Sequence, residues 1–470
     1  MKTVISSPLR DVRASASALA VGAALYGAAV TPAAAWSYKE AAEPYKGTTI
    51  SILDEVTPLQ EIFATIIPQF TEETGIKVNY QLLNHFEVIN RGQADMLSGR
   101  GEYDAVMAHG VQYGLLLDAG VIEPIDDMMA DAALMNPDLD LDDLISPAFE
   151  SLSKFDGKLY GFLLWNYNMV YWARQDLLGN DAEKAAFEEK YGYPLAPATT
   201  LSELYDISEF FTRSAGETLA GETLADDFYG IVLEGINGGT TYAPLWYVFI
   251  RNLGGNIFDE AGVPTFDTPE VIEGLKQWSA LWKFAPPGQA EYSLIDVPTV
   301  MGNGIAAQTI AWSDFVLGID QPGASALSGS FLYAAPPGTG DGTYSSAGEP
   351  SAYVISSASK NPEATFLFFQ WAIDKMTQKT FLSGGIGVPI RDSSWDQLIT
   401  PDNRLAPLYE AMKGSLEGVT AAPKAPRMLE ILDVFNRNAQ QVGLGQMTPE
   451  EGAKAMQAGV SAICNPCFLQ

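Results

Sequence analysis

The sequence has little cysteine, histidine or positive charge. Its 470 residues include two cysteines, two histidines and 27 lysines and arginines, against 58 aspartates and glutamates, and the net charge is −31. Such a negative surface repels phosphate backbones, so we expect no nucleic-acid partner. We interpret the acidic excess as a solvated surface, and a preference for a cationic ligand is the alternative interpretation.

The scarcity of cysteine and histidine also bears on metals. Cys464 and Cys467 stand together near the C-terminus, and in an oxidising compartment we expect them to form a disulfide. Two cysteines are too few for a tetrahedral zinc site, and the two histidines, His85 and His109, are far from them in the sequence. We therefore expect neither a bound metal nor a cofactor.

Signatures of several enzyme classes are missing from the sequence. It contains no Gly-x-Ser-x-Gly elbow, no P-loop and no His-Glu-x-x-His zinc motif. We therefore expect no catalytic residues and no enzyme. A glycosidase remains the alternative, because it needs only two carboxylates about 5–10 Å apart and acidic residues are plentiful.

The N-terminus has the three-part layout of a secretory signal peptide. Basic residues come first, an apolar stretch runs over residues 18–30, and Pro32 to Ala35 place small residues before Trp36. We expect residues 1–35 to be removed near Ala35–Trp36, which indicates a periplasmic protein. Beyond residue 35 no stretch approaches the ~20 consecutive apolar residues that cross a bilayer.

The residues that would remain after removal of 1–35 are too many for a single hydrophobic core, so two lobes are expected. Apolar strand patterns at residues 48–53, 76–80 and 103–107 alternate with helical patterns at 59–74 and 86–97. This order predicts an α/β fold with parallel strands. In such sheets, ligands bind at the loops beyond the carboxyl ends of the strands, here residues 54–57 and 108–113.

Further elements are expected toward the C-terminus. Helical patterns cover residues 200–215, 269–282, 362–375 and 449–463, and a strand pattern covers 352–355. Thr200 and Thr448 are the expected N-caps of the first and last of these helices. Residues 216–227 and 336–348 have the composition of loops.

Seven segments follow one another in an order that is typical of one protein family. They are Ile50–Leu53, Phe70–Val78, Tyr103–Val106, Leu117–Ile125, Asp156–Phe162, Gly302–Ala307 with Trp312, and Ser359–Ala364. In this order they resemble the extracellular solute-binding proteins of the maltose- and sugar-binding type, which are the substrate-binding components of ABC transporters.

The resemblance implies a two-lobed periplasmic-binding-protein fold. Each lobe would be a mostly parallel sheet flanked by helices, and crossover hinge segments would join the lobes. Lobe one would comprise residues 36–158 and 352–391, and lobe two residues 159–351 and 392–470. The partners implied are a small polar solute and an inner-membrane ABC permease, and we expect a monomer.

Sugars present apolar ring faces and many hydroxyls, so a sugar site needs aromatic platforms and side chains that hydrogen-bond in defined directions. By position, the resemblance implies the ligand-binding candidates Asp54, Glu55, His109, Gln112, Tyr113, Asn166, Tyr167, Tyr242, Trp246, Trp312, Asp314, Glu349 and Arg427. Trp312, with Asp314 beside it, is the central candidate.

The resemblance implies that the protein captures a small polar solute, a carbohydrate (sugar, oligosaccharide or polyol), by hinge closure and delivers it to the permease. Two alternatives remain open at this point. One is a binding protein for a cationic or zwitterionic solute such as a polyamine or betaine, in which aromatic side chains would form a cation–π cage. The other is the secreted carbohydrate-active hydrolase.

Overall fold

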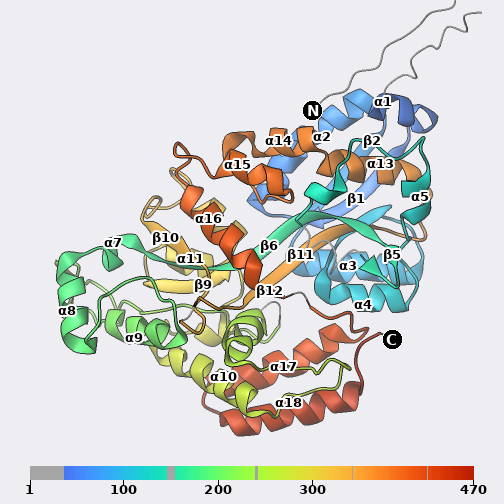
Figure 1. The fold of residues 1–470 in the computed structure, drawn as a ribbon. Coiled ribbons are helices and arrows are strands. Elements are labelled where there is room, and N and C mark those ends of the chain that lie inside the picture. Colours follow the sequence, from blue (N-terminus) through green and yellow to red (C-terminus); the bar gives the residue numbers. More distant parts are fainter. Residues whose placement is uncertain (1–35, 146–153, 239–241, 341, 421, 470) are drawn as a thin grey trace, which may run out of the picture. The chain divides into compact units, whose positions relative to one another are not determined.

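The computed structural model describes residues 36–469, apart from 146–153, 239–241, 341 and 421 (Figure 1). The expected export signal, residues 1–35, lies outside the described residues. Among the helices that are described, none combines the length and the apolar character needed to span a membrane.

The N-terminal part of the chain alternates strands and helices as the sequence predicts. Strand β1 pairs in parallel with β2 on one side and with β3 on the other. The helices between them cover the sheet, because their apolar faces have no other place to be buried. The elements are β1 (Thr49–Glu55), α2 (Pro58–Thr74), β2 (Lys77–Leu83), α3 (His85–Ser98) and β3 (Ala105–His109).

Local sequence signals set the ends of these helices. The hydroxyl of Thr57 caps α2 by accepting a hydrogen bond from the backbone N–H of Leu59, and Pro58 occupies the first turn, where its missing N–H costs nothing. Gly75 ends α2 at φ 75°, a conformation that favours glycine. The side chain of Asn84 caps α3, so that His85 becomes the first residue of that helix.

Two long strands connect the parallel strands to the rest of the sheet. β11 (Ser346–Ile355) lies between β3 and β6 (Gly161–Arg174) and is antiparallel to both. The last third of β6 continues past β11 and pairs antiparallel with β9 (Gln308–Trp312) and β10 (Phe331–Ala334). One hydrogen-bonded sheet of eight strands therefore runs through the described chain (Figure 1).

Helices α10 (Pro269–Ala280), α17 (Met428–Gly443) and α18 (Pro449–Ile463) pack against one another, and α13 (Pro362–Ile373) packs on β6 and β11 (Figure 1). The remaining helices and strands are α1 (Tyr38–Ala41), α4 (Gly110–Asp118), α5 (Asp126–Ala130), β4 (Lys154–Phe155), β5 (Lys158–Leu159), α7 (Gln175–Leu178), α8 (Asp181–Tyr191), α9 (Leu201–Phe211), β7 (Thr218–Leu219), β8 (Glu222–Thr223), α11 (Asp296–Gly302), α12 (Ser313–Ile319), α14 (Lys375–Phe381), α15 (Trp395–Leu398), α16 (Ala406–Ser415) and β12 (Val419–Thr420).

Several boundaries differ from the sequence-based expectation. Capping boxes at Thr200 and Thr448 begin α9 and α18 where expected, but α9 ends at Phe211, four residues early. Residues 346–348, expected in a loop, begin β11. Strand β2 runs on to Leu83 instead of ending at residue 80, because residues 81–83 pair with residues 53–55 of β1.

A disulfide joins Cys464 to Cys467 directly after α18. The backbone N–H of Cys467 donates to the carbonyl of Gly262, and the ring of Phe468 packs edge-on against Phe258. The disulfide thus lies in a segment that folds back on the loop between the π-helix at 244–250 and α10.

Candidate functional site

Three polar side chains meet where the parallel strands end. Glu55 is the last residue of β1, His109 is the last residue of β3, and His85 follows the end of β2 by two residues. Because the carboxyl ends of parallel strands lie at one edge of a sheet, these positions are brought together although they span 55 residues of sequence. We call Glu55, His85 and His109 the histidine cluster.

Within the histidine cluster, one carboxylate oxygen contacts both imidazoles. Oε2 of Glu55 lies 3.2 Å from Nδ1 of His85 and 3.3 Å from Nε2 of His109. The two rings have centroids 4.7 Å apart, and Nδ1 of His109 lies 3.2 Å from Oγ of Ser351 on β11. Burial by itself raises the pKa of the Glu55 carboxyl, but the two imidazoles more than offset this and lower the pKa to about 2. Glu55 is therefore ionised.

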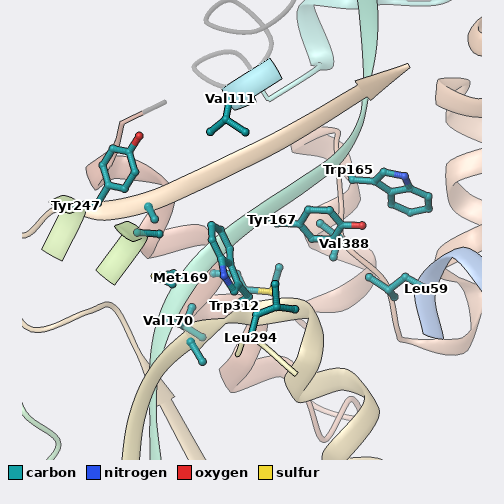
Figure 2. Close-up of a cluster of buried hydrophobic side chains, with 14 of the residues drawn as sticks. Leu59, Val111, Trp165, Tyr167, Met169, Val170, Tyr247, Leu294, Trp312 and Val388 are labelled. Carbon is teal, nitrogen blue, oxygen red and sulfur yellow. The ribbon is translucent and has the colours of Figure 1, made fainter. Parts of the chain in front are cut away.

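The histidine cluster forms one wall of a cavity of about 40 Å³. The opposite wall comes from strands β6 and β9, helix α12 and the segment before α11. It is aromatic and apolar with one carboxyl group, and its residues are Tyr167, Leu294, Trp312, Asp314 and Phe315. Figure 2 shows Trp312 between Met169 and Leu294, with Tyr167 beside it. The cavity thus combines an ionised carboxylate and imidazoles with an indole ring.

Tyr167 and Asp314, both on the opposite wall of this cavity, differ in their surroundings. The hydroxyl of Tyr167 lies 2.6 Å from Nε2 of Gln60 on α2, which fixes the phenol ring. Asp314 lies in the first turn of α12, where it is buried. Burial and the nearby charge of Glu55 raise the pKa of Asp314 to about 7. The cavity therefore holds one ionised carboxylate and one carboxyl group that keeps its proton to a higher pH than an exposed aspartate does.

A second cavity, of about 190 Å³, shares the two histidines as part of its wall. Asn436 on α17 contributes a buried amide oxygen that has no hydrogen-bond partner among the described residues. The other described lining residues come from α3, α4, the segment before the π-helix, and α17. They are Phe86, Ile89, Asn90, Val111, Gly238, Tyr242, Leu429, Leu432 and Asp433.

Asp54, although next to Glu55, does not line either cavity. Its side chain is buried, and Oδ2 accepts hydrogen bonds from the hydroxyl of Tyr80 (2.5 Å), the hydroxyl of Tyr353 (2.6 Å) and Nε1 of Trp165 (3.3 Å). Burial raises the pKa of Asp54 to about 6, although these hydrogen bonds lower it. The three donors lie on β2, β11 and β6, so Asp54 ties four strands together.

Three more predicted ligand-binding residues lie outside the cavity walls. Gln112 closes a capping box at the start of α4, since its Oε1 accepts from the backbone N–H of His109. Tyr113 is fully buried in the hydrophobic core. Asn166 is buried in β6 opposite Pro350 of β11. The geometry gives Gln112 a role in positioning His109.

The aromatic segment at 242–247 contributes one residue to the second cavity. Tyr242 lines that cavity, whereas Trp246 is buried in a π-helix, stacks on Tyr247 at 4.6 Å and donates from Nε1 to Asn256. Trp246 therefore belongs to the core.

The last two candidates lie elsewhere. Glu349 is part of β11, opposite Tyr167, but its side chain lies outside the described residues. Arg427 precedes α17, is about half exposed, and pairs with Glu430. Its guanidinium also donates to the carbonyl of Ile463 at the end of α18. Arg427 thus connects two helices and does not line either cavity described above.

Sequence reasoning missed His85. We set both histidines aside as metal ligands because they are far from the cysteines in the sequence, whereas in the structure both imidazoles contact Glu55. The usable signal is topological. Glu55, His85 and His109 each follow an apolar strand, and parallel strands bring such positions to one edge.

Comparison with known proteins places the chain among binding proteins. A family model described as "bacterial extracellular solute-binding protein" matches residues 54–379. An erythritol/L-threitol-binding protein of Mycolicibacterium smegmatis is 24% identical over 74% of this chain and 72% of its own length. A probable amino-acid ABC transporter periplasmic-binding protein of Sinorhizobium fredii is 24% identical over 89% and 90%.

Among solved structures, the fold matches an ABC transporter solute-binding protein from Agrobacterium radiobacter K84 in complex with ribitol. The TM-score is 0.74 at 22% identity, and the match covers 89% of this chain and 99% of that one. This confirms the two-lobed α/β fold expected from the sequence. Because the family model spans most of the sequence, the chain belongs to the family of bacterial extracellular solute-binding proteins.

Proposed function

We propose that the chain captures a small polyol or sugar in the two adjoining cavities and carries it to an ABC importer. One observation supports this most. The described walls combine an indole platform, carboxyl groups, imidazoles and an amide, and contain neither lysine nor arginine. Neutral polyhydroxyl solutes need such directional hydrogen-bond partners but no countercharge. Relatives named for erythritol and ribitol add support.

The volumes favour a small solute. Cavities of about 40 and 190 Å³ are below the range of about 300–1,000 Å³ typical of sites for larger ligands. The larger one has room for about six water-sized groups at roughly 30 Å³ each. An open-chain polyol of four or five carbons fits this space better than an oligosaccharide does.

A cationic or zwitterionic solute is the second candidate. Ionised Glu55 beside the Trp312 indole could hold an ammonium group by charge and by cation–π attraction. The similarity to a relative named for amino acids adds to this. A free amino acid would also need a partner for its carboxylate, and the described cavity walls offer amide, phenol and imidazole donors but no lysine or arginine for that.

Capture would follow the family's mode of action. Lobe one would comprise residues 36–158 and 352–391, lobe two residues 159–351 and 392–470, and closure would occur about the long strands β6 and β11. Residues 1–35 would direct export to the periplasm and be removed near Ala35–Trp36. The released protein would act as a monomer with an inner-membrane permease.

The test is isothermal titration with erythritol, ribitol, mannitol, maltose, putrescine, betaine and an amino acid. We expect saturable binding of a polyol without turnover. A solute present at 100 times its dissociation constant should also raise the free energy of unfolding by roughly 2.7 kcal/mol. A response to amines alone would replace the first candidate by the second. Release of a hydrolysis product from a glycoside would contradict both.

Trp312 is the residue to vary in this assay. Trp312→Phe keeps an aromatic face and most of the packing, so the affinity should fall by a few-fold only. Trp312→Leu removes the face, and we expect a loss of about tenfold or more, on the order of 1.4 kcal/mol. Trp246→Phe, in the core, is the control and should leave the affinity unchanged. Equal affinities for wild type and Trp312→Leu would take the indole out of the site.

A further inference from the structure

We propose that the histidine cluster is a binding site for a transition-metal ion of the Zn²⁺ class. The ion would take Oε2 of Glu55, Nδ1 of His85 and Nε2 of His109 as ligands. This goes beyond the proposed capture of a solute and does not depend on it, although the two sites share a cavity wall.

The distances fit a common centre. Zn²⁺ binds imidazole nitrogen and carboxylate oxygen at about 2.0–2.2 Å, which places neighbouring ligands of a tetrahedron about 3.3–3.5 Å apart. Oε2 of Glu55 lies 3.2 Å from one imidazole nitrogen and 3.3 Å from the other. All three ligand atoms lie within 4.8 Å of one another. Small side-chain adjustments would therefore suffice for coordination.

The surroundings are also those of a metal site. In the described part of the chain, the buried Nε2 atom of His109 has no hydrogen-bond partner, although it lies 3.3 Å from Oε2 of Glu55. The opposite ring nitrogen, Nδ1, lies within hydrogen-bond distance of Oγ of Ser351, which holds the ring as outer partners of metal ligands do. His109 thus directs one nitrogen to the cluster while its other nitrogen is held in place.

Backbone structure fixes all three ligands on regular elements. Glu55 and His109 end strands β1 and β3, which are hydrogen-bonded neighbours, and His85 begins α3 behind its Asn84 cap. Ligands on strands and helix ends keep their spacing better than ligands on loops. A preformed arrangement of this kind lowers the cost of binding an ion.

The ligand set indicates which ion. Two imidazoles with one carboxylate suit Zn²⁺ and neighbouring transition metals, whereas Ca²⁺ and Mg²⁺ prefer oxygen ligands alone. Three protein ligands leave one tetrahedral position open. That position faces the cavity of about 40 Å³, where one water molecule of roughly 30 Å³ would fit.

The sequence makes a clean experiment possible. His85 and His109 are the only histidines of the chain, and both cysteines are in the disulfide. After chelator treatment, Zn²⁺ should bind at one ion per chain in calorimetry and shift both imidazole signals in the NMR spectrum. Co²⁺ should give the visible absorption of a four-coordinate site, without the sulfur-to-metal band of a thiolate ligand.

Variants separate the cluster from the acidic surface. Glu55→Gln keeps the shape of the side chain, and His109→Gln keeps a polar group near Nε2. Each should weaken Zn²⁺ binding by at least about tenfold. Asp433→Asn, which removes an exposed carboxylate of the neighbouring cavity, should leave the affinity unchanged. Circular dichroism checks that each variant is folded.

Three results would overturn the proposal. They are imidazole signals that do not respond to Zn²⁺, a Glu55→Gln variant that binds as wild type does, or displacement of Zn²⁺ by equal concentrations of Ca²⁺ or Mg²⁺. The NMR result needs no variant, so a misfolded mutant cannot leave the question open. Solute titrations in the presence of chelator test capture of the polyol separately.

Discussion

Asp54 and Glu55 are adjacent acidic residues, but they belong to two regions that shift their carboxyl pKa values in opposite directions. Asp54 centres a network with Tyr80, Trp165 and Tyr353, which we call the tyrosine network, and burial raises its pKa to about 6. Glu55 belongs to the histidine cluster, where the imidazoles more than offset burial and lower its pKa to about 2.

Alternation along β1 explains the difference. Successive side chains of a strand point to opposite faces, so Asp54 and Glu55 reach different neighbours. The face of Asp54 offers neutral phenol and indole donors, which satisfy a carboxylate but bring no positive charge. The side of Glu55 offers groups that can carry a proton. One region therefore has the chemistry of a structural tie, and the other has that of a binding site.

The largest effect should come from Asp54→Ala. This change leaves two phenol hydroxyls and an indole N–H without their acceptor, and each unsatisfied buried group costs about 1–3 kcal/mol. We expect the free energy of unfolding to fall by about 3–5 kcal/mol in urea denaturation. Glu72→Ala, at an exposed position of α2, is the control and should change it by less than about 0.5 kcal/mol. A small effect of Asp54→Ala would mean that the network does not tie the strands.

A smaller loss is expected for Tyr353→Phe. The ring stays in place, and only the hydrogen bond to Asp54 and the 3.2 Å contact with the hydroxyl of Tyr80 disappear. A hydrogen bond to a charged group contributes about 1.5–3 kcal/mol, so we expect about 2 kcal/mol of destabilisation. A double-mutant cycle sharpens the test. In the Asp54→Ala background the same change should cost much less, and an equal cost in both backgrounds would contradict the network.

Glu55→Gln should behave in the opposite way. The amide keeps the shape of the side chain and can still hydrogen-bond to an imidazole, so we expect the free energy of unfolding to fall by less than for Asp54→Ala. Affinity for the captured polyol should fall by about tenfold, because a charged acceptor is replaced by a neutral one. Denaturant unfolding and calorimetry on one preparation measure the stability and the polyol affinity, respectively. A stability loss as large as that of Asp54→Ala would make Glu55 a second structural tie.

The contrast also shows what the sequence could predict. The strands and helices around β1, β2 and β3 follow from apolar periodicity and caps, and the loop after β1 is expected at the ligand-binding edge. That periodicity does not show that Asp54 is structural and that Glu55 lines the cavity. The two roles depend on contacts with Tyr353 and His85, which reach the end of β1 only through tertiary structure.

Other differences have similar causes. Expecting β2 to end at Tyr80 put His85 five residues after a strand end instead of two after Leu83. Gly348 and Pro350 are turn formers in isolation, but pairing with β6 and a bulge after Ser351 accommodate them within β11. Trp246 and Trp312 are both buried in the hydrophobic core, and only the packing around Trp312 leaves its ring on the wall of a cavity.

The smallest effect is expected for Arg427→Ala, which tests how far the site extends. The guanidinium is about half exposed and pairs with Glu430, and solvent screens exposed pairs of this kind. It also donates to the carbonyl of Ile463, so we expect only a slight loss of stability and an unchanged affinity for the polyol. Calorimetry of the variant against Glu55→Gln makes the comparison direct. If Arg427→Ala weakened polyol binding as much as Glu55→Gln does, the solute would also contact the region where α17 meets α18. Arg427 would then be a binding residue and not only a connection between two helices.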